Sequence, residues 1–296
     1  SRGLGDVYKR QVFLSAFTTK LAVYALARGY AGTEILIWIG VAMTAFPIFY
    51  AVIENDLRRV LAYSLNNQLG FMVVGVGIGT ELALNGAVAH AFVHILYKAL
   101  LFMSMGAVLY RTGTIRASDL GGLYRSMPWT AAFCIVGAMS ISAFPLFSGF
   151  VAKSLTMSAV TEGYYMLTFI GLLIASAGVM EHSGIKIPYF AFFGHDSGIR
   201  CKEAPWHMCL AMGAAAVLCI AIGWFPQPLY ALLPYPVVYQ PYADLGHSVT
   251  QLQLLLFAAL AFVVLKRTGM YPAEQASLNL DTVSYTHLTL PTNREV

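Results

Sequence analysis

The chain is poor in charged residues. Only 11% of its 296 residues are Asp, Glu, Lys or Arg, whereas a soluble domain carries roughly 25%. Because 58% of the residues are hydrophobic, a water-soluble globule of this size would expose large apolar patches. This composition nearly excludes a soluble fold and favours lipid as the solvent.

Cysteine is scarce and nucleotide-binding signatures are missing. The four cysteines show no C-x-x-C or other ligand-like spacing, so neither an iron–sulfur nor another metal site is expected. The segment Gly75–Gly79 lacks the six-residue dinucleotide fingerprint, and we expect it to allow close helix packing. The 18 basic residues are dispersed, which does not suggest a nucleic-acid surface. We therefore expect no cofactor, no metal and no nucleic-acid partner.

The two ends differ from the rest. Residues 1–11 and 283–296 are polar, stop abruptly against apolar sequence, and resemble translated sequencing-adaptor tails of assembled metagenomic reads. We do not expect them to belong to the fold; the alternative is a native arm and tail. The sequence does not begin with Met, and we expect no signal peptide in it. We expect residues 12–282 to be one transmembrane domain, truncated at its N-terminal side.

Eight segments are long enough to cross a bilayer as helices, for which about 20 mostly apolar residues are needed. They are Val12–Arg28, Thr33–Ile53, Val60–Gly79, Leu82–Tyr110, Pro128–Val160, Tyr164 to about Phe193, His207–Leu233 and Val249–Lys266. Backbone groups in hydrocarbon must be hydrogen-bonded internally. The sequence thus predicts an all-α polytopic membrane protein of about eight transmembrane helices.

Basic residues alternate between the connections. The first connection begins at Arg28, and the third, fifth and seventh have no Lys or Arg. The positive-inside rule then places the start of the first span, the second, fourth and sixth loops and the C-terminus in the cytoplasm of a bacterial inner (plasma) membrane. The residues on that side are Arg58, Arg59, Arg111, Arg116, Arg125, Arg200, Lys202, Lys266 and Arg267.

Ionisable residues inside the spans are candidate functional groups, because a charge at the bilayer centre costs at least about 2.5 kcal/mol. Lys20 lies eight residues from either end of its span. His90, His94 and Lys98 follow at four-residue steps and therefore share one helix stripe. Desolvation disfavours a charged lysine and favours proton exchange with histidine. We interpret the stripe as a proton relay; the alternative is a set of structural residues.

The fifth span is expected to be broken at mid-membrane. Pro145 cannot donate a hydrogen bond to the carbonyl of Ile141, and Gly149 adds slack. Broken helices in transporters expose carbonyls that hold water and ions. Lys153 follows the break and would lie deep in the membrane if the chain is unwound there, or near the outer boundary if it is not.

Two other polar groups of residues have less specific interpretations. In the third span, Ser64 and Asn67 could hydrate a pathway, although interhelical hydrogen bonding is the simpler interpretation. Glu181, His182 and Lys186 are expected near the cytoplasmic interface, with the aromatic run 189–193 as part of an anchoring belt.

Four ordered motifs carry a family resemblance. They are Glu54–Gly70, His90–Phe102, Gly121–Pro128 and Phe147–Lys153. Together they resemble the proton-translocating antiporter-like subunits shared by respiratory complex I and Mrp-type Na⁺/H⁺ antiporters. The run Phe17–Leu26 looks closer to the Mrp branch, to its D-type subunits. The resemblance implies the C-terminal part of a fourteen-helix fold in which Lys20, His90, His94, Lys98 and Lys153 form the proton relay.

The resemblance also implies other membrane subunits as partners, with H⁺ and Na⁺ as the ions. The first hypothesis is a proton-conducting subunit of a Na⁺/H⁺ antiporter. The alternatives are a proton-pumping subunit of NADH:quinone oxidoreductase or a membrane hydrogenase, and a non-conducting scaffold. Arg58 stands where many members have Lys, and Asn66-Asn67 replaces a commoner hydroxyl pair. The family's upstream glutamate and first broken-helix lysine are not in this sequence, so half a channel is expected to be missing.

Overall fold

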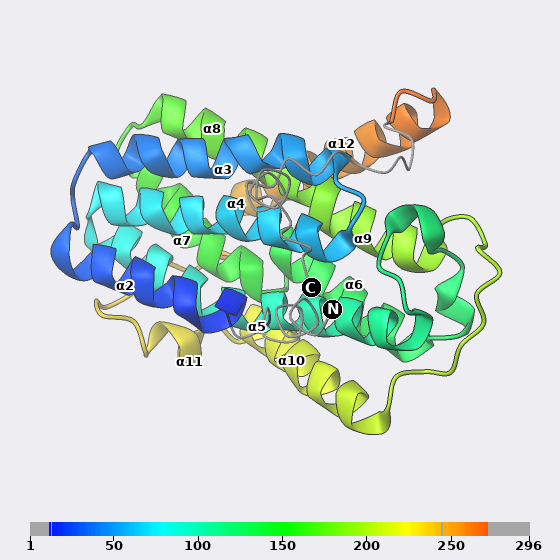
Figure 1. Ribbon diagram of the computed structural model, residues 1–296. Helices are drawn as coiled ribbons and strands as arrows, with labels where there is room; N and C mark the ends of the chain where they lie inside the picture. The colour runs from blue at the N-terminus through cyan, green and yellow to red at the C-terminus, as the bar shows by residue number, and fades with distance from the viewer. Residues whose placement is uncertain (1–11, 13, 244, 272–296) are drawn as a thin grey trace, which may run out of the picture.

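The computed structural model describes residues 12, 14–243 and 245–271. Both adaptor-like tails, and residues 272–282 of the expected domain, lie outside the described residues. Within the described residues the chain is helical and forms no strand, apart from one isolated bridge between Asp56 and Arg116. The helices pack side by side as a bundle (Figure 1).

Each predicted span is mainly helical among the described residues, although the fifth is interrupted between Ile141 and Ser148 and the seventh after Trp224. The elements are η1 (Leu14–Thr18, a π-helix), α2 (Thr19–Gly29), α3 (Ile35–Ile53), α4 (Leu57–Ile78), α5 (Glu81–Thr112), η2 (Ala117–Asp119), η3 (Leu123–Arg125), α6 (Pro128–Ile141), α7 (Ser148–Glu162), α8 (Met166–Val179), η4 (Met180–Ile185, π), α9 (Lys186–Pro188), η5 (Tyr189–Phe193, π), α10 (Trp206–Trp224), α11 (Gln227–Tyr230) and α12 (Leu245–Arg267).

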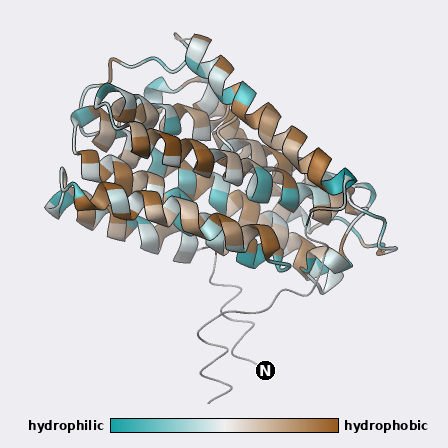
Figure 2. Ribbon diagram, turned by 90° about the horizontal axis from the view of Figure 1, so that it is seen from above, coloured by the Kyte–Doolittle hydropathy of each residue, from teal (hydrophilic) through white to brown (hydrophobic). Residues whose placement is uncertain are grey.

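The bundle is suited to a bilayer. Among the described residues, five segments are long and apolar enough to cross a membrane: Ile35–Ile53, Glu81–Thr112, Met166–Phe193, Trp206–Trp224 and Leu245–Arg267. Outer helices expose large apolar side chains, such as Phe46 and Phe49 of α3 at 63% and 73%. Hydrophilic residues concentrate in the loops at the helix ends (Figure 2). Since water would disfavour such a surface, the protein is a multi-pass membrane protein.

The second, fourth and sixth connections meet at one end of the bundle, as the alternation of basic residues requires. Asn55 Nδ2 donates to Ser118 Oγ at 3.0 Å. The backbone of His195 packs so closely on Gly121, and Asp196 on Gly122, that a Cβ at either glycine would meet them. These contacts place the three loops on the same side, which supports the count of spans.

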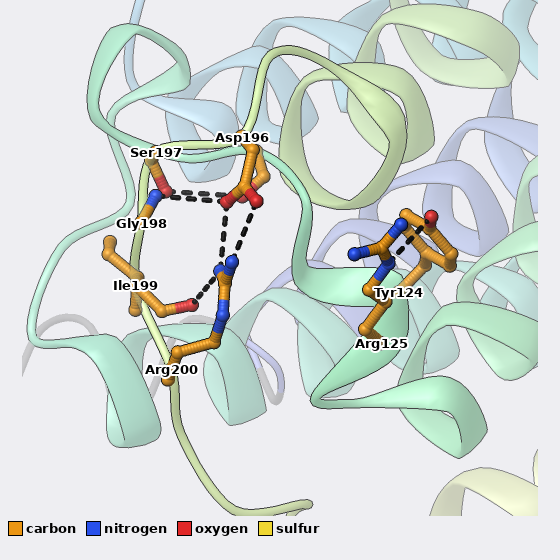
Figure 3. A network of polar contacts seen from close by, with 8 residues as sticks. Tyr124, Arg125, Asp196, Ser197, Gly198, Ile199 and Arg200 are labelled. Carbon is orange, nitrogen blue, oxygen red and sulfur yellow. Dashed lines mark hydrogen bonds and ion pairs between the residues drawn. The ribbon is translucent and has the colours of Figure 1, made fainter.

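An ion pair shapes the sixth connection (Figure 3). Arg200 Nη2 donates to Asp196 Oδ2 at 2.7 Å, and the backbone N–H of Gly198 donates to Asp196 Oδ1 at 3.0 Å. The Arg200 guanidinium, followed by the Gly198 N–H, holds the pKa of the Asp196 carboxyl well below its usual range. The same pair raises the pKa of Arg200. Both side chains are exposed, so the pair orders the loop more than it stabilises the bundle.

The long helix α5 occupies the centre of the bundle. It packs against α4, α6, α7 and α10, and its buried residues belong mainly to the largest hydrophobic cluster. At the end opposite the three loops, Asn85 near the start of α5 exchanges two hydrogen bonds with the backbone of Tyr235, at 3.0 and 3.1 Å. Because other helices surround α5, the polar side chains on the inner faces of α4 and α5 are buried in protein.

Candidate functional site

The predicted stripe on α5 is a buried face. His90, His94 and Lys98 are each 0% exposed, because α5 is regular across them and turns each four-residue step toward the same neighbours. The shared face is confirmed. Their role as a relay remains a prediction.

His90 belongs to a compact polar triangle between α4 and α5. Its Nε2 lies 3.1 Å from Gln68 Oε1 and 3.0 Å from Tyr97 Oη, and Tyr97 Oη is 3.2 Å from Gln68 Oε1. When Nε2 carries the proton it can donate to Tyr97 or Gln68, which leaves Nδ1 as an acceptor. When Tyr97 donates to Nε2, Nδ1 carries the proton. Both tautomers are therefore accommodated, which suits a group that passes protons.

His94 and Lys98 have no such partners. Neither ring nitrogen of His94 nor the Nζ of Lys98 has a hydrogen-bond partner among the described residues. The nearest aromatic contacts are the Tyr97 ring, 5.2 Å from the His94 ring, and the Phe102 ring, 5.7 Å from Lys98 Nζ. Burying an unpaired polar group costs about 1 to 3 kcal/mol. Such groups are retained where water or function requires them.

Lys20 is buried where the first span is irregular. Its side chain is 8% exposed, and Nζ donates to the carbonyl oxygen of Ser15 at 2.7 Å and to Thr19 Oγ1 at 3.2 Å. Ser15 lies in the π-helix η1, where the wider turn changes the pairing of main-chain carbonyls. The span is thus a π-turn followed by an α-helix, and the lysine is held by the π-turn.

The break in the fifth span is confirmed. Helix α6 ends at Ile141 and α7 begins at Ser148; Pro145 lies between them, where Ala143 and Leu146 have positive φ values of 56° and 71°. Gly149 does not lie in the unwound stretch but in the first turn of α7. A Cβ there would overlap the carbonyl of Ser140, so Gly149 permits the close approach of α6 and α7.

Lys153 uses the carbonyl that the proline frees. Its Nζ donates to Ile141 O at 2.9 Å, the acceptor that the missing N–H of Pro145 leaves without a helical partner. The side chain is 4% exposed, which agrees with the deep position expected for an unwound helix. Its ammonium lies 5.0 Å from the centroid of the Phe71 ring, and Phe71 in turn lies 6.0 Å from the His90 ring. The Phe71 ring therefore contacts both Lys153 and His90.

A cavity of about 280 Å³ leads away from Lys153 along one face of α7. Residues at successive turns of α7 line it, from buried Ser154 through half-buried Ser158 to exposed Glu162. His247 and Gln251 of α12 line the facing wall. Polar and apolar side chains both line the cavity, which is large enough to hold several waters, so it can connect Lys153 to the outside of the bundle.

His182 and Lys186 of the sixth span, expected near the cytoplasmic interface, face the interior of the bundle, and their depth in the membrane stays a prediction. They are 0% and 4% exposed and lie inside the bundle. His182 Nδ1 is 2.8 Å from Ser183 Oγ, which donates to Ser64 Oγ at 2.9 Å. Lys186 Nζ donates to the carbonyls of residues 51, 52 and 54, at the C-terminal end of α3. Position along the span does not report which way a side chain faces, and these two face inward.

The predicted aromatic belt was wrong in part for the same reason. Phe190 and Phe192 are buried in the protein at 1% and 0%, whereas Phe193 is 46% exposed. Phe190 and Phe192 both lie in the π-helix η5, whose backbone directs their rings into the core. Of the aromatic run, Phe193 is exposed and Tyr189 is half-buried.

The polar residues of α4 make interhelical hydrogen bonds, as the simpler interpretation predicted. Asn67 Nδ2 donates to Thr44 O of α3 at 2.6 Å, and Gln68 Nε2 donates to Asn67 Oδ1 at 2.8 Å. Ser64 accepts the bond from Ser183. Whether Ser64 and Asn67 also hydrate a pathway remains a prediction.

Sequence reasoning missed Tyr97 and Ser183. Tyr97 lies seven residues after His90, and extending the α5 stripe by that step would have found it. Ser183 follows His182 directly, and no pattern in the sequence indicates its contact with α4. Among the described residues, no group of three or more His, Cys, Asp or Glu is arranged to hold a metal ion.

A helical, multi-pass bundle with a row of buried lysines and histidines beside a broken helix defines the class of antiporter-like membrane subunits. Comparison with known proteins agrees. Residues 9–179 match the family described as NADH:quinone oxidoreductase/Mrp antiporter, TM, and the chain belongs to this family.

Individual relatives are longer than this chain. It is 31% identical over 226 residues to the D subunit of the Na(+)/H(+) antiporter of Alkalihalophilus pseudofirmus, an alignment that covers 72% of this chain and 45% of the relative. It is 28% identical over 225 residues to NADH-ubiquinone oxidoreductase chain 5 of Hypocrea jecorina, covering 70% and 32%. The chain therefore spans less than half the length of both curated relatives.

A solved structure shares the fold. The Mrp complex from Dietzia sp. DQ12-45-1b contains a chain that superimposes with a TM-score of 0.67 at 24% sequence identity, covering 74% of this chain and 50% of that one. The all-helical antiporter-like fold is thereby confirmed. These relatives are subunits of multisubunit membrane complexes in some cases and of respiratory enzymes in others, so the chain is an antiporter-like membrane subunit.

Proposed function

We propose that this chain conducts protons in a multisubunit Na⁺/H⁺ antiporter of a bacterial plasma membrane, together with other membrane subunits. The observation that carries the proposal is the buried α5 face of His90, His94 and Lys98, with buried Lys20 on the first span, which packs against α5, and buried Lys153, whose cavity opens along α7. The similarity to the D subunit of an Na⁺/H⁺ antiporter supports the choice of Na⁺.

The row acts as one electrostatic unit. The His90 and His94 rings lie 6.3 Å apart, and the Phe71 ring contacts both His90 and Lys153. A proton that arrives at one member therefore disfavours a second charge on its neighbours, which promotes onward transfer. Transfer between groups beyond hydrogen-bond reach proceeds through one water or a side-chain rotation.

The direction follows from the positive-inside assignment. With the second, fourth and sixth loops in the cytoplasm, the exposed end of the α7 cavity near Glu162 faces the opposite side. In this proposal Lys153 exchanges its proton with the outside through the cavity, and the α5 face supplies it from within.

Replacing Lys153 by Ala in the natural, assembled complex tests the proposal. We expect Na⁺-dependent proton movement in proteoliposomes to be lost, because no titratable group then lies at the base of the cavity. Lys202→Ala, a change of an exposed loop lysine, is the matched control and should keep wild-type flux. Wild-type flux in Lys153→Ala complexes of normal composition would overturn the proposal.

A second candidate rests on the similarity to NADH-ubiquinone oxidoreductase chain 5. In that case the same row would pump protons in a respiratory complex. Peripheral flavin and iron–sulfur subunits that co-purify with the chain, and NADH-driven proton movement, would favour it. A complex of small membrane subunits alone would favour the antiporter.

A further inference from the structure

His182 is a buried titratable group outside the row of relay residues. It is 0% exposed, its Nδ1 is paired with Ser183 Oγ, and its Nε2 has no hydrogen-bond partner among the residues that the structure describes. An imidazole kept only for packing would be replaced at lower cost by an apolar ring. The unpaired nitrogen therefore indicates a role.

His182, Ser183 and Ser64 form a chain of hydrogen bonds in which each group donates to the next. Ser183 Oγ donates to Ser64 Oγ at 2.9 Å, so its own oxygen is free to accept the 2.8 Å bond from Nδ1–H of His182. This arrangement fixes the tautomer that carries hydrogen on Nδ1. Nε2 is then the nitrogen with an available lone pair.

The local backbone brings His182 to this place. It lies in η4, a π-helical segment that packs against the end of α6, and π-helical turns occur frequently at functional sites. Gly184 of η4 lies directly on Ser142 at the helix break, where a Cβ would overlap the Ser142 hydroxyl. His182 is thereby held beside the break that frees the Lys153 acceptor.

His182 lies between the row and the cytoplasmic end. Ser64, the end of its hydrogen-bond chain, is one helical turn from Gln68, which holds His90 and Tyr97. On the other side, Lys186 is four residues further along the same segment and binds the end of α3. The charged groups that act on His182 are Lys98, Lys186 and Lys153.

We propose that His182 is a further proton-carrying residue, which links the Lys186 end of the bundle to Ser64 and the α5 face; this rests on the proposed function. A proton binds at Nε2 and forms the imidazolium. The Nδ1 proton then moves to Ser183 Oγ as the Ser183 hydroxyl proton moves to Ser64 Oγ. His182, Ser183 and Ser64 each gain one proton and lose one, and the proton that leaves Ser64 moves through water to His90, which Gln68 and Tyr97 hold on the α5 face.

His182→Asn in the assembled complex is the direct test. The Asn amide nitrogen takes the place of Nδ1 and keeps the bond to Ser183, but the side chain cannot bind a proton at neutral pH. We expect proton flux to fall by at least about tenfold, the scale expected when one acid–base group is removed, and its dependence on pH to change. A purely structural histidine would leave both unchanged. His207→Gln, a change of an exposed histidine, is the control and should have wild-type flux.

Two further variants make the outcome decisive. If His182→Asn does not assemble, Ser183→Ala and Ser64→Ala each remove one oxygen of the chain and should lower flux several-fold; wild-type flux in both would overturn the inference. Lys153→Ala separates the two proposals. Loss of flux in Lys153→Ala with wild-type flux in His182→Asn overturns the role of His182 alone, whereas wild-type flux in Lys153→Ala overturns both.

Discussion

The close contact between the two halves of the broken helix predicts a large effect for a single added methyl group. In a Gly149→Ala variant, Cβ would overlap the Ser140 carbonyl oxygen and stand 2.9 Å from its carbon. Ordinary contact begins near 3.4 Å. Both obstructing atoms are backbone, so no side chain can rotate away, and α6 and α7 must separate by more than about 1 Å.

That separation exceeds what the Lys153 contact tolerates. The Nζ···O distance to Ile141 is 2.9 Å, and a contact of about 3.6 Å is no longer a hydrogen bond. Overpacking costs about 1 to 3 kcal/mol, against a gain of about 0.5 to 1 kcal/mol when Ala replaces Gly in a helix. We expect a net loss of stability on the order of 1 to 2 kcal/mol, together with reduced proton flux.

Thermal unfolding of the purified complex and flux in proteoliposomes measure the two effects. Gly106→Ala in α5 is the control, because the nearest atom outside its helix would be Arg58 Nη1 at 3.9 Å. That variant should be as stable as the wild type or more stable by up to about 1 kcal/mol. A Gly149→Ala protein with unchanged Tm and flux would show that α6 and α7 do not approach each other as described.

Three further predictions concern the ends of the bundle and are measured by thermal unfolding. Asn85→Ala leaves the backbone N–H and C=O of Tyr235 without their 3.1 and 3.0 Å bonds and should lower the free energy of unfolding by about 1 to 3 kcal/mol. An unchanged Tm would show that these two bonds do not stabilise the bundle. Glu203→Ala removes a carboxylate that accepts two backbone N–H bonds, at 2.8 and 3.4 Å, in the first turn of α6, and should cost about 1 kcal/mol. Because the pKa of Asp196 is lowered by Arg200, its stabilisation is present above the ordinary carboxyl pKa of about 3.9 and is lost as the pH falls below it. The difference in Tm between wild type and Asp196→Asn should therefore shrink as the pH is lowered, and a constant difference would contradict the ion pair.

Regular features of this fold could be predicted from the sequence because they follow from single physical requirements. A run of apolar residues must be helical in lipid, and four-residue spacing places His90, His94 and Lys98 on one face. A proline without an N–H must interrupt the ladder at Pro145. Each of these expectations uses local information only, and the structure agrees with each.

The parts that could not be predicted depend on irregular turns and on neighbours distant in sequence. The helical rise per residue, counted from the start of the sixth span, gives the depth of His182 but not the direction of its ring. That direction depends on the π-helical turn η4, which packs against α4. Similarly, no pattern indicates that Ser64 would meet a hydroxyl 119 residues away. A hydropathy profile records the depth of a residue and gives no information on its rotation about the helix axis.

The irregular turns also explain how the bundle holds buried lysines. In a regular helix every main-chain carbonyl already accepts an N–H, so a buried ammonium needs a carbonyl that the helix has released. Lys153 at the proline break and Lys186 at the end of α3 have one, and Lys20 binds a carbonyl of the π-turn η1. Lys98 lies in the unbroken part of α5, and its Nζ has no hydrogen-bond partner among the described residues. Among these four lysines, the charged form of Lys98 therefore receives the least compensation from main-chain acceptors.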